Sequence, residues 1–272
     1  MSTKVKKTLL YIGLIVLSAV CLFPFLLMIV NATRNGREIM TSFTLIPGDQ
    51  LKANWSTMSG YFNIFRGLGN SLFIAVCSTA LTAYFSALTA YALAVYKFKG
   101  KNIIFVTILV FMMIPAQLGL LGFYDLVNAM SLTDSYIPLI IPAIASPGTV
   151  FFLRQYTEAS LSKALLEAAR IDGASETRIF HKIVLPIMAP GIATMSIGAF
   201  IGSWNNYLLP LILLYTPEKF TLPVMMSSMR ASQDFTGNQG AIYLTVAVSV
   251  IPIMTFFSKY IISGISAGGV KE

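Results

Sequence analysis

The amino-acid sequence predicts an all-α integral membrane protein with six transmembrane helices. Of its 272 residues 56% are hydrophobic and only 11% are charged, whereas about 25% are charged in soluble domains. Six apolar stretches approach the roughly 20 residues that a membrane helix needs, and none contains Asp, Glu, Lys or Arg. Because lipid cannot hydrogen-bond a bare backbone, we expect helices over 8–30, 71–95, 103–123, 136–153, 187–209 and 241–258.

The first stretch resembles a signal peptide because Lys4, Lys6 and Lys7 precede an apolar run. A signal sequence has an apolar region of about 7–15 residues, but this run continues to Val30. We therefore expect an uncleaved first helix.

The apolar stretches carry two further signals. Cys77, like Cys21 in the first stretch, falls inside an apolar run, which indicates a packing residue rather than a disulfide or a metal ligand. Prolines recur within the runs, where they bend membrane helices. These bends serve either a gate between helices or fixed curvature for packing, and the sequence leaves both open. The prolines are Pro24, Pro115, Pro138, Pro142, Pro147 and Pro252.

The placement of Lys and Arg predicts the orientation. With six helices, the two termini and the segments 96–102 and 154–186 lie on one side, which carries thirteen Lys and Arg residues against six on the other. Because positive charge accumulates on the cytoplasmic side, both termini are expected in the cytoplasm. The same bias accounts for the net charge of +8 without nucleic acid.

The segment 160–185 has the features of a helix-turn-helix in the cytoplasm. Good helix formers run from Ser162 to Ile171, and Gly173 stands where helices commonly end in a left-handed residue. We expect Ala164, Leu165 and Ala168 to share an apolar face with Leu161, away from Lys163, Glu167 and Arg170, and we expect Ala168, Ala169 and Ala174 to be exposed to a partner. Ser175 can cap a second helix with an apolar stripe of Phe180, Ile183, Val184 and Ile187.

Two functions fit this segment on composition alone: an amphipathic helix resting on lipid headgroups, or a contact for another protein. The spacing favours the second. It resembles the EAA signature of permease subunits from ABC importers, which runs EAA, three residues, Gly, nine residues, I-x-L-P. The matching residues are Glu167, Ala168, Ala169, Gly173, Ile183, Leu185 and Pro186.

This resemblance implies a type I ABC importer permease with a coupling helix that docks on a cytoplasmic ATPase. Glu167, Arg170 and Asp172 would then pair with charges of that partner. ATP and Mg²⁺ would be bound by the ATPase dimer, because the chain has no G-x-x-x-x-G-K-[ST] motif and needs no cofactor or metal of its own.

A second pattern, from Phe200 to Leu211, resembles the fifth-span signature of sugar-importer permeases of the maltose-transporter type, specifically the shorter MalG-like subunit. The resemblance covers roughly residues 65–272 and includes Pro190 and Gly191. It implies a substrate path formed in part by Trp204, Asn205, Asn206 and Tyr207. The alternative is an interfacial aromatic residue with amides that bond between helices.

Two other regions are long enough to form structure outside the lipid: 31–70 and 210–240. The second is rich in Met, Pro and polar residues, and the resemblance implies that it contacts a binding protein. Gly198-x-x-x-Gly202 is a helix-packing pattern for a neighbouring span or a partner permease.

An enzymatic function is not indicated. Gly264-Ile265-Ser266-Ala267-Gly268 matches a hydrolase elbow, but His181, the one histidine, lies in the cytoplasmic segment. Ion-coupled carriers place ionisable groups inside the membrane, and the six predicted spans have none. A secondary transporter acting alone is therefore the weaker alternative.

The sequence thus predicts one permease domain over 1–272 in a bacterial plasma or inner membrane. We expect it to be a non-catalytic subunit of an ATP-driven importer, for a sugar or oligosaccharide or else another solute. Its expected partners are an ABC ATPase dimer, a second homologous permease, an extracellular or periplasmic sugar-binding protein and membrane lipid, but no nucleic acid.

Overall fold

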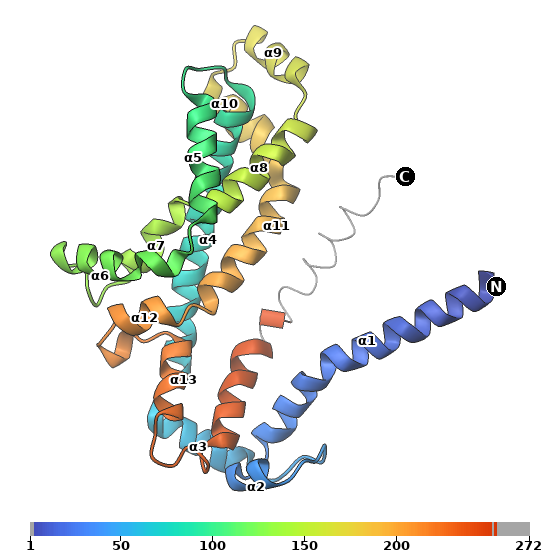
Figure 1. Ribbon diagram of the computed structural model, residues 1–272, viewed down its shortest axis with the longest axis vertical. Helices are drawn as coiled ribbons and strands as arrows, with labels where there is room; N and C mark the ends of the chain where they lie inside the picture. The colour runs from blue at the N-terminus through green and yellow to red at the C-terminus, as the bar shows by residue number, and fades with distance from the viewer. Residues whose placement is uncertain (1–2, 252, 255–272) are drawn as a thin grey trace. The chain divides into compact units, whose positions relative to one another are not determined.

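The computed structural model describes residues 3–251 and 253–254, which form helices and turns but no strand. The chain divides into two compact units, one from residues 1–66 and 224–255 and one built on residues 67–223. Each is described here by itself (Figure 1). That the chain forms one permease domain over 1–272 stays a prediction.

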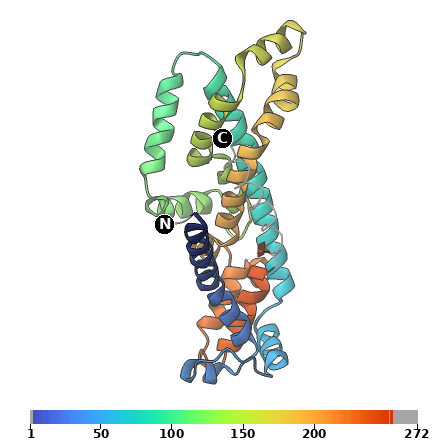
Figure 2. The ribbon, with the colours of Figure 1, turned by 90° about the vertical axis from the view of Figure 1, so that its right-hand side faces the viewer.

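The second unit is a bundle in which α4, α8 and α11 run side by side (Figures 1 and 2). Its helices in chain order are α4 (Ile64–Val95), α5 (Lys101–Met113), η1 (Ala116–Gly119), α6 (Leu120–Ala129), α7 (Ile137–Ile140), η2 (Ile141–Ile144), α8 (Pro147–Ser160), α9 (Lys163–Ile171), α10 (Glu176–Ile179), η3 (Phe180–Val184), α11 (Leu185–Trp204), α12 (Leu208–Leu213) and η4 (Pro217–Lys219).

Four stretches of the described chain are long and apolar enough to cross a membrane. They are Val5–Ala32, Ile64–Val95, Ile137–Ser160 and Glu176–Trp204. The sixth expected span, 241–258, falls in the shorter apolar helix Gln239–Ile251 and otherwise largely outside the described residues. The number of spans therefore stays a prediction.

The third expected span, 103–123, is interrupted in the structure. Its helix α5 ends at Met113, and the chain bends by 87° before continuing through η1 and α6. Pro115 explains the interruption, because it has no N–H to continue the helical ladder and drives the preceding residue out of helical geometry. Ile114 accordingly adopts φ −83° and ψ 120°. The two pieces count as one span only if this bend lies within the membrane.

A buried apolar cluster fixes the segment 160–185 onto the bundle. It comprises Ala87, Ala90, Tyr91, Leu153, Leu166, Ala169, Ile179, Phe180, Val184 and Met188, from α4, α8, α9, α10, η3 and α11. Burial of a large apolar side chain contributes about 1.5–3 kcal/mol. The segment is therefore held by the packing of its own side chains rather than suspended as a free loop.

The first unit contains α1 (Thr3–Ala32), α2 (Gly36–Thr41), α3 (Leu51–Tyr61), most of α13 (Leu222–Arg230) and the helix Gln239–Ile251. The buried Arg34 organises it: its guanidinium donates to Asn31 Oδ1 at 3.1 Å and to Ser42 Oγ at 2.7 Å. Asn54 Nδ2 donates to the carbonyls of Ala32 and Arg34. The region 31–70 is thus structured, as its length suggested.

Candidate functional site

The first helix of the segment 160–185 ends as its sequence predicts. Gly173 has φ +77°, the left-handed conformation that glycine adopts at least cost. Its N–H donates to the Arg170 carbonyl, and the N–H of Ala174 donates to the Ala169 carbonyl, both at 3.0 Å. These two bonds form a Schellman motif, which stops α9 and turns the chain sharply into the next helix.

The second helix begins at Ser175, whose Oγ accepts a hydrogen bond from the N–H of Arg178 at 3.4 Å. It passes through the π-helical η3 into α11. Phe180 and Val184 of the expected stripe are buried, whereas Ile183 and Ile187 are half-buried. Leu185 is half-buried and Pro186 is exposed where η3 continues into α11. The signature residues thus form one continuous connection between α9 and α11.

The faces of α9 differ from the expected pattern. Leu166 and Ala169 are the buried residues of the helix, so Ala169 is not exposed. Of the four residues expected on one apolar face, Ala164, Leu165 and Ala168 are exposed, and Leu161 is half-buried against the cluster. Leu166 and Ala169 pack in the buried cluster with residues of α4, α8, α10, η3 and α11. The periodicity of α9 alone does not show which of its residues make these contacts.

The outward face of α9 combines apolar or small residues with charged residues of both signs. The exposed residues of α9 and of the turn after it are Lys163, Ala164, Leu165, Glu167, Ala168, Arg170, Ile171, Asp172 and Gly173. Ile171 is 86% exposed and Leu165 is 43% exposed. Sequence reasoning did not single out Ile171. Its position next to the helix end that Gly173 sets was the signal that could have done so.

A polar network links α9 to the end of α4. Arg170 Nε lies 2.7 Å from Glu176 Oε1, and Tyr96 and Tyr91 donate hydrogen bonds to Glu176 Oε2. The bonds to Glu176 hold the pKa of Arg170 above its ordinary value. Arg170, expected to pair with charges on a partner, is thus paired within the chain, and sequence reasoning missed Glu176.

A large cavity lies in the second unit, lined by α4, α5, η1, α6, α7, η2, α8, α11 and α12. Its volume is about 1170 Å³, above the 300–1,000 Å³ typical of ligand sites. Its polar groups are hydroxyls and amides, and no Asp, Glu, Lys, Arg or His contributes to the lining. The polar lining residues are Ser78, Thr82, Gln117, Ser146, Thr149, Thr194, Ser203 and Asn206.

Only one of the four residues expected in the substrate path lines this cavity: Asn206. Trp204 is 7% exposed and stacks on Phe200 with the ring centroids 5.9 Å apart. Asn205 Nδ2 donates to the Ile201 carbonyl, and Tyr207 is exposed. Their role in a substrate path stays a prediction.

The structure brings other residues to the cavity that the sequence did not assign to it. Gly198 and Gly202, read from sequence as a helix-packing pair, both line the wall, and a Cβ added to either would meet nothing within 4 Å. Pro138 and Pro142 line it as well. The prolines leave short, irregular helices there, whose carbonyls at Leu139 and Ala143 accept hydrogen bonds from Ser78 and Thr82.

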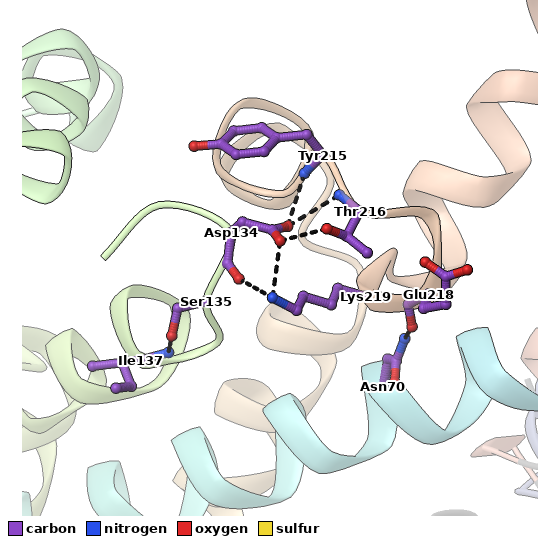
Figure 3. Close-up of polar contacts among 8 residues, drawn as sticks. All are labelled: Asn70, Asp134, Ser135, Ile137, Tyr215, Thr216, Glu218 and Lys219. Carbon is purple, nitrogen blue, oxygen red and sulfur yellow. Dashed lines mark hydrogen bonds and ion pairs between the residues drawn. The ribbon is translucent and has the colours of Figure 1, made fainter. Parts of the chain in front are cut away.

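At the end of the unit remote from α9, two loops are joined at Asp134 (Figure 3). Its carboxylate accepts hydrogen bonds from the N–H groups of Tyr215 and Thr216 and from the Thr216 hydroxyl, at 3.1, 3.0 and 2.5 Å. Lys219 Nζ lies 2.8 Å from Asp134 Oδ2. Lys219 and Thr216 hold the pKa of Asp134 well below its ordinary value.

Comparison with known proteins gives a consistent assignment. Residues 83–262 match the family described as "Binding-protein-dependent transport system inner membrane component". The chain is 38% identical to the arabinooligosaccharides transport system permease protein AraQ of Halalkalibacterium halodurans, covering 97% of this chain and 96% of that protein. It is also 38% identical to AraQ of Bacillus subtilis, with 94% and 92% covered.

A solved structure shares the fold. The chain matches a crystal structure of a bacterial ABC transporter involved in the import of the acidic polysaccharide alginate with a TM-score of 0.80. The match covers 96% of this chain and 97% of that chain at 21% sequence identity, a level at which the similarity speaks for the fold alone.

Proposed function

Because the chain belongs to the family of binding-protein-dependent transport system inner membrane components, we propose that it is the permease subunit of an ATP-driven importer for an uncharged oligosaccharide. It spans the plasma or inner membrane of a bacterium, with both termini in the cytoplasm. The chain itself catalyses no reaction. ATP and Mg²⁺ are bound by a partner ATPase dimer.

The observation that carries the substrate class is the neutral lining of the cavity. An anionic solute entering a site away from water needs a compensating charge, because an unpaired buried ion is costly. The residues of this chain that line the cavity supply none. Hydroxyls and amides such as those of Ser203, Thr149 and Gln117 match the hydroxyl groups of a sugar. The two AraQ proteins, named for arabinooligosaccharides, agree with this class.

The outward face of α9 supports the coupling role. The buried cluster holds α9 against the bundle, and the Arg170–Glu176 pair joins α9 to α10. Exposed small and apolar residues allow close approach of a second protein, and Glu167 and Asp172 add charge. ATP-driven closure of the ATPase dimer would move α9 as a rigid body and thereby rearrange the spans in alternating access.

A second homologous permease and a solute-binding protein complete the proposed assembly. Gly198 and Gly202 line the cavity and are exposed, and a Cβ added to either would meet nothing within 4 Å. A second subunit would close that side of the path. The binding protein would deliver solute at the end opposite α9.

Affinity purification of the tagged full-length chain from native membranes tests this function. The expected result is recovery of an ATPase, a different permease and a binding protein that carries a neutral oligosaccharide. A binding protein loaded with a charged solute would overturn the substrate class alone. A lone chain that transports solute after reconstitution would overturn the importer itself in favour of a secondary transporter.

A further inference from the structure

We propose that Asp134 is a positioning residue for transport, which fastens three walls of the cavity to one another at the end remote from α9. The proposal rests on the proposed function, since it concerns the closure of the transport path. It follows from how many groups meet at one side chain and from where their helices lead.

Asp134 makes an unusual number of hydrogen bonds to one segment of the chain. Its carboxylate accepts from Tyr215, Thr216 and Lys219, its carbonyl accepts from Lys219 Nζ at 2.6 Å, and its N–H donates to the Leu213 carbonyl at 2.7 Å. The side chain of Asp134 is 18% exposed. Both the main chain and the side chain of this one residue are therefore engaged with the segment 213–219.

The backbone of Asp134 is left-handed, with φ +54°. Few residues with a Cβ adopt this left-handed conformation, and Asp is one that tolerates it. Ser131, in the same loop, has φ +56° but makes no side-chain hydrogen bond to the segment 213–219 among the described residues, in contrast to Asp134. The conformation at 134 is thus accompanied by a set of bonds that the conformation at 131 lacks.

The segment that Asp134 binds is also attached to α4. Asn70 Nδ2 donates to the carbonyls of Glu218 and Phe220, both at 2.9 Å, and the Leu222 N–H donates to Ser71 Oγ at 2.9 Å. Asn70 and Ser71 belong to α4, and Figure 3 shows Asn70 reaching from that helix to Glu218. The segment 213–222 is consequently tied to α4 as well as to Asp134.

The elements joined by these bonds continue into helices that line the cavity. Asp134 lies in the loop between α6 and α7, and the segment 213–222 runs from the last residue of α12 to the first residue of α13. Each of these helices, like α4, contributes to the cavity lining, through Leu120, Leu139, Leu208 and Ser78 respectively. The bonds at Asp134 and Asn70 therefore set the spacing of three walls. Rocking of such walls as one body would open the path only when the assembly moves, whereas separate movement would let solute leak.

The test measures leakage of the complete purified complex in vesicles without ATP. The probes are neutral sugars of increasing size, from a pentose to a trisaccharide, whose entry is followed by vesicle swelling. Asp134→Gly keeps the backbone conformation accessible and removes the carboxylate, and we expect several-fold faster swelling than with the wild-type complex. Asp134→Asn keeps an oxygen for Tyr215 and Thr216 but loses the ion pair, so a smaller increase is expected.

Ser131→Gly is the matched control, because it changes the other left-handed residue of the same loop and should leave the vesicles as tight as wild type. Hydrogen exchange at the amides of Tyr215 and Thr216 reports whether the attachment is lost. Two results for Asp134→Gly would overturn the proposal. One is that the vesicles stay tight although the amides of Tyr215 and Thr216 exchange freely. The other is that these amides stay protected. Absence of ATP-driven uptake by the wild-type complex would instead refute the proposed function, and the leakage comparison would still decide this one.

Discussion

Arg170 and Glu176 face each other across the turn at Gly173, with Arg170 Nε 2.7 Å from Glu176 Oε1. The pair joins the last turn of α9 to the first turn of α10, and Tyr96 connects it to the end of α4 through a hydrogen bond to the same carboxylate. A displacement of α9 would therefore reach α4 through Glu176 as well as through the apolar cluster.

Glu176→Gln should lower the efficiency of coupling more than it lowers stability. The paired side chains are 37% and 49% exposed, and exposed ion pairs contribute only about 0.2–1 kcal/mol. Assembly should persist, while more ATP is hydrolysed per solute transported. The ratio is measured on the reconstituted complex with Arg178→Gln, an exposed charge of the same helix, as the control. An unchanged ratio would assign the network to stability alone.

Gly173→Ala should destabilise the turn between α9 and α10. A Cβ meets no atom within 4 Å there, so the cost comes from the backbone at φ +77° and amounts to about 1–2 kcal/mol. Thermal unfolding of the purified complex measures it. Gly69→Ala is the control, since Gly69 is also free of contacts within 4 Å and lies within the helix α4, where alanine should stabilise by about 0.5–1 kcal/mol. Equal effects at both positions would show that the turn is not specified by Gly173.

Ile171→Asp and Glu167→Lys should weaken ATPase binding or coupling without unfolding the chain. Ile171 is 86% exposed and Glu167 is also on the outward face of α9, and exposed substitutions usually change stability by less than about 0.5 kcal/mol. Each variant should reach the membrane yet lose solute uptake. Recovery of the ATPase with the tagged chain and uptake into cells are measured together. Wild-type values for both variants would remove α9 from the coupling mechanism, and Arg178→Gln, which changes an exposed charge of α10 rather than of α9, should stay at wild-type level.

The sequence predicted the local geometry of this segment better than its packing. Gly173 and Ser175 mark helix ends as predicted, because left-handed turns and side-chain caps depend on neighbouring residues. The buried face of α9 was not predictable, because Leu166 and Ala169 are chosen by contacts with α4 and η3, which are distant in sequence. The cavity was not predicted for the same reason, because helices distant in sequence form it. The bonds of Asp134 to the segment 213–219 likewise join residues that are far apart in the sequence and share no local pattern.

The contribution of Asp134 to stability should depend on pH in one direction. Its pKa in the folded chain is lowered, chiefly by Lys219 and then Thr216, from an unfolded value of about 3.9. The stabilisation is therefore fully present above that unfolded value and is lost as the pH falls through the lower folded value. The difference in hydrogen exchange at Thr216 between wild type and Asp134→Asn should stay constant from neutral pH down to about 4 and then shrink. If the difference already disappeared between about pH 7 and 5, where histidine titrates, its source would not be the Asp134 carboxylate.

Two glycines of α11 should respond in opposite ways to the same substitution. A Cβ at Gly191 would lie 2.9 Å from Cγ of Tyr156, whereas a Cβ at Gly198 would meet nothing within 4 Å and would enter the cavity. Gly191→Ala should therefore destabilise by about 1–3 kcal/mol through overpacking, while Gly198→Ala should be neutral or slightly stabilising. Gly198→Phe should leave thermal unfolding near that of Gly198→Ala but abolish uptake, because its ring occupies the proposed path. Full uptake by a stably assembled Gly198→Phe complex would mean that solute passes elsewhere.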